Sequence, residues 1–398
     1  MKRTKNLLKY ALSCIQKYKV RTLVILICLG VSASLFSSVA FMKDGLTKEG
    51  ELSLKYAPDL TVQGISAGRQ ALVNRSYSTI AQSAPGVTST AERIWGYGNV
   101  GNTLLVIVGL DLRNPAFFTQ AYPLDSGTFL KPQSNGSVVI GKAVADLIGA
   151  KVGSKLTILT ESNKPEEFVV VGIFNSETSI YSADTILMSI NYARTFFDLP
   201  SDKVTDILVY VSDIDPQSKS TLTNYVARQF SELPNCRVVT KDILLKAQEA
   251  TYGDRSGFFS VVWYVVLISV AIIAFNQTVV VGHESKFEIG LLKALGFSTS
   301  DIIQVRLVES AVLGVIAAVV GLTFGIVYDV FLGAPVLKEF MMGWATLYPG
   351  FAVPVLISAQ TVLFTFAVTI VPLLFATVIP SWINATVDPD IAMRGARA

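Results

Sequence analysis

One segment resembles a known ligand-binding motif. It is Gly136-Ser-Val-Val-Ile-Gly141-Lys142-Ala143, which nearly matches the phosphate-binding P-loop pattern G-x-x-x-x-G-K-[ST]. In a P-loop, backbone N–H groups and the lysine hold nucleotide phosphates, and the final hydroxyl holds Mg²⁺. Here Ala143 lacks that hydroxyl, and the residues between the glycines are strand formers. We therefore interpret the segment as a strand that turns into a helix, and expect no cofactor bound by this chain.

Few other residues could support catalysis. The chain has one histidine, His283, and three cysteines that lie far apart, Cys14, Cys28 and Cys236. A histidine without cysteine or acid partners at metal-ligand spacing is weak support for a metal site. Three scattered cysteines make no disulfide framework. We predict a chain that is not an enzyme, without catalytic or metal-binding residues.

The composition indicates the class of protein to which the chain belongs. Of its 398 residues, 51% are hydrophobic and 16% charged, with a mean hydropathy of +0.50. Soluble domains usually carry about 25% charged residues. A net charge of +3 is too small to indicate a nucleic-acid partner. These values predict a membrane protein.

Uncharged runs mark the elements that cross the bilayer. A helix of about 20 apolar residues spans the ~30 Å hydrocarbon core. The sequence predicts four such spans, at residues 22–42, 256–282, 310–328 and 355–379. Residues 329–354 lie between the last two spans and contain Pro349, Gly350 and Pro354, so we assign them to an external loop with an interfacial segment.

Charge asymmetry predicts the orientation. The first 21 residues hold seven Lys/Arg and no acid, so this basic N-terminal elbow is expected in the cytoplasm. The loop 283–309 and the tail 380–398 are then cytoplasmic too. The predicted location is the inner membrane, with several spans and both termini inside.

Residues 43–255 form the large domain expected on the outer side. Two segments, 59–94 and 206–240, share a strand–helix–strand rhythm that predicts a small α/β unit built from both ends of the domain. Between them, residues 97–200 contain short β-rich runs separated by Gly, Asn and Pro, which we interpret as an inserted subdomain. The fold class is therefore an α-helical membrane protein with four transmembrane helices and an α+β extracytoplasmic domain.

The loop after the second span contains an amphipathic helix. At 100° per residue, Lys286 and Lys293 share one face. The broadly opposite face carries acids and leucines: Glu284, Glu288, Leu291, Leu292 and Leu295. Gly296 is a natural helix stop, and Ser298 to Ser300 can cap the next helix. From spacing alone, the helix fits a lipid surface or a cytoplasmic protein equally well.

Three glycines fall on one face of the third predicted span. They are Gly314, Gly321 and Gly325, and the last two form a G-x-x-x-G motif. Such motifs allow close approach of two helices in membranes. We expect this face to pack against a neighbouring helix.

The motif Glu288-Ile-Gly290-Leu-Leu-Lys-Ala-Leu-Gly296, followed by Asp301-Ile, resembles the signature loop of FtsX-like ABC permeases of the MacB type. Further similarities cover essentially the whole chain: Lys19-Val-Arg21-Thr22, Asn135-Gly-Ser-Val-Val-Ile-Gly141, Val152-Gly153-Ser-Lys-Leu and Asp388-Pro389-Asp-Ile-Ala-Met-Arg394.

The resemblance implies a permease dimer, with an identical copy or a paralogue as the second permease, and two ATP-binding subunits that carry ATP and Mg. It makes residues 284–296 the coupling helix and implies mechanotransmission, in which ATP-driven closure moves the external domains. The expected output is efflux or extraction of an amphipathic or extracytoplasmic substrate, with a periplasmic adaptor and outer-membrane channel as further partners. Regulation of a cell-wall hydrolase or sensor is the alternative.

Overall fold

The protein is described by a computed structural model that covers residues 2–113, 116–132, 134–160, 164–175, 184–212, 215–252, 257–284, 286–342 and 354–386. It divides into two compact units. A helical unit comprises Met1–Leu46, Tyr252–Gly343 and Val353–Ala398. The second unit comprises Thr47–Thr251 and Trp344–Ala352 and contains the β-strands.

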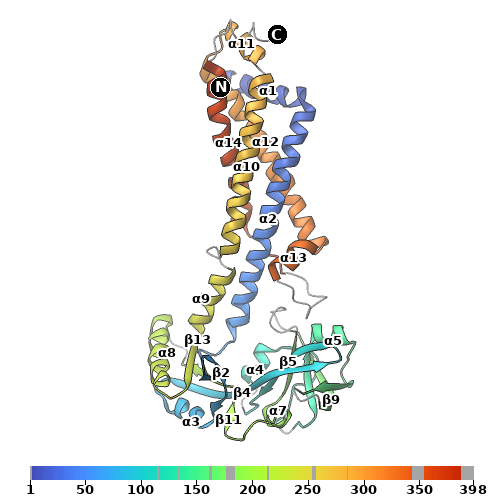
Figure 1. Cartoon of the computed structure of the whole chain (residues 1–398), viewed down its shortest axis with the longest axis vertical. Helices are drawn as coiled ribbons and strands as arrows, with labels where there is room; N and C mark the ends of the chain where they lie inside the picture. Colours follow the sequence, from blue (N-terminus) through green and yellow to red (C-terminus); the bar gives the residue numbers. More distant parts are fainter. Residues whose placement is uncertain are drawn as a thin grey trace. The chain divides into compact units, whose positions relative to one another are not determined.

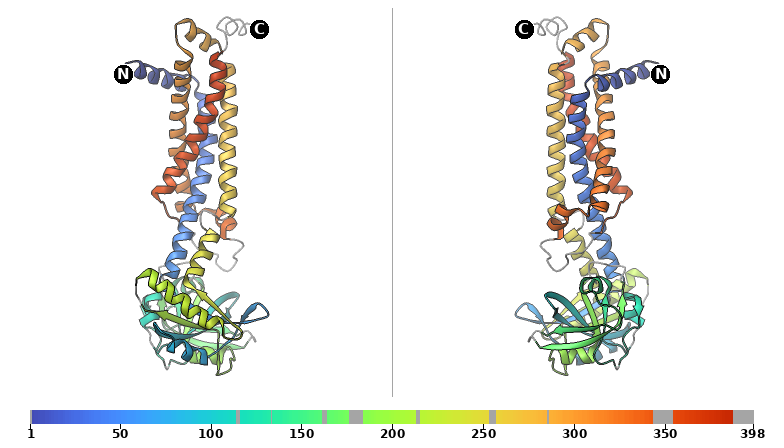
Figure 2. Two further views of the ribbon diagram at one scale, coloured as in Figure 1. Left: turned by 90° about the vertical axis from the view of Figure 1, so that its left-hand side faces the viewer. Right: turned by 90° about the vertical axis from the view of Figure 1, so that its right-hand side faces the viewer.

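Four long helices run side by side in the helical unit (Figure 1). They are α2 (Lys19–Lys55), α10 (Gly257–Glu284), α12 (Thr299–Ile326) and α14 (Ala359–Thr386). Shorter elements are α1 (Lys2–Lys17), α11 (Lys286–Ala294), the π-helix η1 (Val327–Phe331) and α13 (Pro335–Met342). Helix α1 lies across one end of the bundle instead of along it (Figure 2).

The bundle has the length and apolarity of a membrane protein. Among the described residues, three helical stretches meet both criteria: Thr22–Lys55, Thr299–Phe331 and Ala359–Ile383. Helix α10 has 28 residues, and its described apolar stretch is Phe259–Ile273. The prediction of a membrane protein is therefore confirmed, whereas α10 as a fourth span remains a prediction.

The helices differ from the uncharged runs at their ends. Helix α2 extends to Lys55, beyond the run that ends at Met42. Helix α14 begins at Ala359, after the predicted start at 355, because the Ser358 hydroxyl accepts a hydrogen bond from the Thr361 N–H and caps the helix. The predicted tail beyond residue 386, with the motif 388–394, lies outside the described residues, as do Pro349 and Gly350.

The second unit is built on one large mixed sheet of 11 strands, with a separate two-stranded pair. The strands are β1 (Leu60–Ser66), β2 (Arg69–Ala71), β3 (Val73–Asn74), β4 (Val87–Val100), β5 (Thr103–Leu110), β6 (Leu124–Gly127), β7 (Ser137–Gly141), β8 (Lys155–Leu159), β9 (Pro165–Phe174), β10 (Thr185–Ser189), β11 (Lys203–Val204), β12 (Asp206–Val211) and β13 (Cys236–Thr240). The helices are α3 (Ser76–Ser83), α4 (Ala116–Ala121), α5 (Lys142–Ile148), α7 (Ile190–Phe196), α8 (Pro216–Ser231) and α9 (Lys241–Tyr252).

The two strand–helix–strand segments meet as predicted. Strand β1 pairs antiparallel with β12 and β13, which come from the far end of the domain. The strands between them continue the same sheet, and their assignment to an inserted subdomain stays a prediction. The order β13-β1-β12-β4-β5-β10-β7-β9-β6 is continuous, because β4 is 14 residues long and pairs with both β12 and β5.

Apolar side chains cover both faces of this sheet. On one face, helices α3, α5, α7 and α8 bury residues such as Ala81, Val144, Phe196 and Phe230 against the strands. On the other face, Phe118 of α4 packs with a second buried cluster. Two-sided burial explains why the β12 sequence reads as a continuous apolar run and not as an alternation.

One carboxylate connects four strands of the sheet. Asp206, at the start of β12, has no exposed surface. Its oxygens accept hydrogen bonds from Gln63 Nε2 (3.0 Å), Gln70 Nε2 (3.1 Å), Arg93 and Trp95 Nε1 (2.9 Å), which lie on β1, β2 and β4. The Arg93 guanidinium forms an ion pair with Asp206 at 2.6 Å. The buried charge is thus neutralised and fully hydrogen-bonded, as such groups must be.

Candidate functional site

The helix predicted to couple the permease to a partner is α11, at the same end of the bundle as α1 (Figure 1). One side of α11 is anchored. Ile289 is buried against Ile302 of α12 and Ala385 of α14, and Gly290 is buried beside it. The anchoring fixes the helix to two long helices of the bundle, so a force on α11 reaches both.

The other side of α11 presents leucines to solvent. Leu291 is 48% exposed and Leu295, just beyond the end of the helix, is 69% exposed, while Leu292 is half-buried. Phe297 adds a further exposed apolar side chain at 37%. We call Leu291, Leu295 and Phe297 the α11 leucine face. Exposed apolar side chains gathered on one element are typical of a binding surface.

The predicted helix stop and cap are both present. Gly296 has φ +88°, a conformation that favours glycine, and its N–H bonds to the Lys293 carbonyl. Ser298 and Asp301 then form a capping box, in which the side chain of each residue accepts a hydrogen bond from the backbone N–H of the other. The connection between α11 and α12 is therefore short and well defined. The side chains of Glu284, at the end of α10, and Glu288, within α11, lie outside the described ones.

The glycines of α12 lie against two different helices. A Cβ added at Gly321 would be 2.5 Å from Ala33 Cβ and 2.8 Å from the Gly30 carbonyl oxygen, both on α2. A Cβ added at Gly325 would be 2.3 Å from Ser37 Oγ, also on α2. Gly314 instead faces α14. We call the contact of Gly321 and Gly325 with α2 the α2–α12 seam.

We expect Gly321→Ala to destabilise the helical unit by about 1–3 kcal/mol, because the new methyl group overlaps backbone that cannot move away. Thermal unfolding of the purified protein in detergent measures the effect. Gly314→Ala is the matched control, since its methyl group would meet the side-chain ends of Ile370 at 3.1 Å and Leu373 at 3.2 Å, which can rotate. Equal losses in the two variants would contradict a backbone-tight seam.

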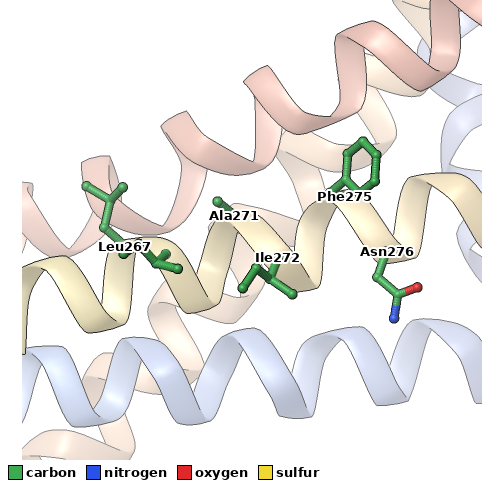
Figure 3. A pocket seen from close by; sticks show the side chains of 6 residues that line it. Leu267, Ala271, Ile272, Phe275 and Asn276 are labelled. Carbon is green, nitrogen blue, oxygen red and sulfur yellow. The ribbon is translucent and has the colours of Figure 1, made fainter.

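A shallow hollow of about 440 Å³ lies along α10. Figure 3 shows that the side chains of Leu267, Ala271, Ile272, Phe275 and Asn276 project from this helix. Its lining is aliphatic or aromatic except for the Asn276 amide, so it offers no acid, base or nucleophile. Among the described residues, no group of three or more His, Cys, Asp or Glu side chains could hold a metal ion.

Two protein families account for most of the chain. Residues 22–225 match the MacB-like periplasmic core domain. Residues 260–389 match the FtsX-like permease C-terminal domain, which includes α11, the seam glycines and α14. The chain belongs to the FtsX-like, MacB-type family of ABC transporter permeases. This confirms the resemblance on which the coupling-helix prediction is based.

Curated relatives of this FtsX-like permease match about half of it. The lipoprotein-releasing system transmembrane protein LolC of Neisseria meningitidis is 26% identical over 48% of this chain and 47% of its own length. An uncharacterized ABC transporter permease of Methanocaldococcus jannaschii, MJ1507, is 28% identical over 52% of this chain and 51% of its own length. The chain therefore spans about half the length of the curated relatives it matches.

Two solved structures are similar to about half of the chain. The periplasmic region of MacB from Actinobacillus actinomycetemcomitans is 14% identical over 48% of this chain and 92% of its own, with a TM-score of 0.36. The extracellular domain of the Gram-positive transporter YknZ is 11% identical over 46% of this chain and 99% of its own, with a TM-score of 0.33.

The segment similar to a P-loop folds in this permease as the sequence predicts. Residues Ser137–Gly141 form strand β7 and Lys142–Ile148 form helix α5. The residues that would have to cradle a phosphate, Val138 to Ile140, are fully buried in the sheet. Lys142 Nζ lies 3.4 Å from Asp125 on the surface. The interpretation as strand, turn and helix is confirmed.

Sequence reasoning missed one polar residue in the membrane unit of the permease. The predicted third span ends at residue 328, which places Asp329 in the predicted external loop, yet Asp329 is only 5% exposed and lies in η1. The spacing of Asp329 from the two seam glycines could have indicated its position. Gly321, Gly325 and Asp329 follow one another at intervals of four, which on a helix places all three toward the same neighbour.

Proposed function

We propose that this permease couples ATP hydrolysis on a separate subunit to movement of its extracytoplasmic domain, and so drives efflux or extraction of an amphipathic or extracytoplasmic substrate. The observation that carries the proposal is the α11 leucine face, exposed on a helix whose other side is anchored at Ile289. A short, fixed helix with exposed leucines is suited to the groove of a partner.

The partner is an ABC ATP-binding subunit, in two copies, that supplies ATP and Mg. Leu291 and Leu295 would be the apolar anchors in its groove, since anchors buried at the centre of an interface carry most of the binding energy. Glu284 and Glu288 would contribute charge contacts at the rim, and Gly296 would end the docked helix. A second permease, identical or paralogous, would complete the transporter.

The proposed orientation places α1, α11 and both termini in the cytoplasm. It is supported by the seven basic residues before the first span, the strongest charge asymmetry in the chain. Helix α10, with 28 residues, would measure about 42 Å, enough to cross the bilayer as the fourth span. The chain would then reside in the inner membrane with its large domain outside.

The proposed output is extraction. One relative is named for lipoprotein release, and a lipoprotein is an amphipathic molecule. An efflux pump of this type would also engage a periplasmic adaptor and outer-membrane channel. Genes for such partners beside this gene would support transport, whereas a neighbouring cell-wall hydrolase gene would favour the signalling alternative.

Cysteine labelling tests the orientation. Starting from a chain without Cys14, Cys28 and Cys236, we expect an impermeant thiol reagent to label Lys151→Cys in intact cells. Native Cys236 is a poor probe, because burial raises the pKa of its thiol and lowers its thiolate fraction. Ser285→Cys should react only after the membrane is permeabilised. Labelling of Ser285→Cys in intact cells would overturn the topology.

A further inference from the structure

The feature that the proposed function leaves unexplained is a buried acid inside the helical unit. Asp329 lies in η1, which extends α12 and belongs to the membrane-length stretch Thr299–Phe331. Ionisable residues inside membrane segments are costly, and those that occur usually have a function. A π-helical turn within a helix is also frequent at functional positions.

The two oxygens of Asp329 have different surroundings. Oδ1 is hydrogen-bonded to the Ser38 hydroxyl of α2. Oδ2 is buried and has no hydrogen-bond partner among the described residues. The described side chains also place no basic group in ion-pair distance of Asp329. An ionised carboxylate here would therefore be a buried charge with a single neutral partner, which proteins avoid.

The neutral form fits this environment. The Ser38 hydroxyl donates to Oδ1, which in the neutral form is the carbonyl oxygen of the carboxyl group. Oδ2 then carries the proton as an uncharged hydroxyl, whose lack of a partner costs much less than that of a charge. A bound metal cation is a poor alternative, because hard cations take six or more oxygen ligands.

We propose that Asp329 is a proton-binding site that holds the outer end of the α2–α12 seam closed while it is protonated. Gly321 and Gly325 bring α12 against α2, and the Asp329–Ser38 hydrogen bond is the next contact along the same pair of helices. Loss of the proton puts an unneutralised charge into this contact. The helices then separate far enough to hydrate it.

Few other titratable groups face this site. On α2, Lys43 and Asp44 lie beyond Ser38 and form an ion pair with each other at 3.1 Å. In η1, Tyr328 precedes Asp329, and its hydroxyl accepts a hydrogen bond from the Val336 N–H. Helix α14 contains no titratable residue, and the described charged side chain of α13 is Lys338. Asp44 also accepts from the Ser358 hydroxyl at 2.7 Å, so it is a compensated carboxylate and a natural control.

Infrared spectroscopy of the full-length permease in lipid nanodiscs tests the protonation directly. A protonated carboxyl group has a carbonyl stretching band separate from the carboxylate bands. At neutral pH we expect the wild type to show this band, Asp329→Asn to lose it, and Asp44→Asn to retain it. Asparagine has the shape of the neutral carboxyl group, so the variant should remain folded. An absent band in the wild type, or a band unaffected by Asp329→Asn, would overturn the proposal.

Cross-linking tests the effect on the seam. Val31→Cys with Val320→Cys places two partly exposed thiols beside the seam, where the Val320 side chain lies against Gly30 of α2, in a chain otherwise free of cysteine. Raising the pH with a pH-independent bifunctional reagent should reduce the cross-linked fraction when Asp329 is present and leave it unchanged with Asp329→Asn. The same pH dependence in both chains would contradict a role for this proton in closing the seam.

Discussion

Replacing Leu291 and Leu295 together by alanine is expected to detach the permease from its ATP-binding subunit. Truncating one central interface anchor typically costs about 2 kcal/mol, so loss of both should weaken binding on the order of a thousandfold. Co-purification of the ATP-binding subunit with the tagged permease measures the loss. Transport should fail as well, and any remaining ATP hydrolysis should no longer respond to the permease.

The permease itself should remain folded and inserted in this double variant. Both leucines are exposed, and substitutions at exposed positions usually change the free energy of unfolding by less than about 0.5 kcal/mol. Leu147→Ala, at an exposed leucine of α5, is the matched control and should co-purify normally. Charge reversal at Lys286 and Lys293 should have a smaller effect. If the lysine variants detach the subunit and the leucine variants do not, the two faces of α11 have been assigned in reverse.

Asp206→Ala is expected to produce the largest loss of stability in the second unit. Removing one partner of a buried ion pair typically costs about 3–5 kcal/mol, since the Arg93 guanidinium would be left without its carboxylate. The variant would also remove the acceptor of Gln63, Gln70 and Trp95. Amide hydrogen exchange by mass spectrometry should show the loss first in β12 and β4.

The control for this variant is Asp125→Ala. Asp125 pairs with Lys142 at 3.4 Å, and the two side chains are 40% and 48% exposed. Exposed ion pairs contribute only about 0–1 kcal/mol, so exchange in β12 should be unchanged. Comparable effects of the two substitutions would mean that the Asp206 hydrogen bonds do not hold the sheet together.

Features that depend on residues close together in the chain were predicted from the sequence. The stop at Gly296 and the cap at Ser298 follow from backbone conformation and one side-chain hydrogen bond. The strand and helix of residues 137–148 follow from residue type. Helix α2 extends past its uncharged run because helical conformation does not require apolar residues, and a charge marks only the end of the hydrocarbon core.

Long-range pairing could not be predicted from one sequence. Strand β4 pairs with β12, more than a hundred residues later in the chain, and one sequence does not show which distant strands become neighbours. Asp329 was missed for a related reason. A charged residue next to an apolar run usually marks the membrane boundary. Here Asp329 is instead buried, because Ser38 on another helix forms a hydrogen bond with it.

The most direct test of the proposed coupling is the distance between the two copies of the second unit in the proposed permease dimer during ATP binding and hydrolysis. Spin labels at Lys151→Cys, in cysteine-free permease reconstituted with its ATP-binding subunit, report this distance by electron spin resonance. We predict that ATP shifts the distance distribution in the otherwise unmodified permease and has no effect in the Leu291→Ala, Leu295→Ala variant. An unchanged distribution while ATP is hydrolysed, or the same shift in both proteins, would contradict coupling through α11.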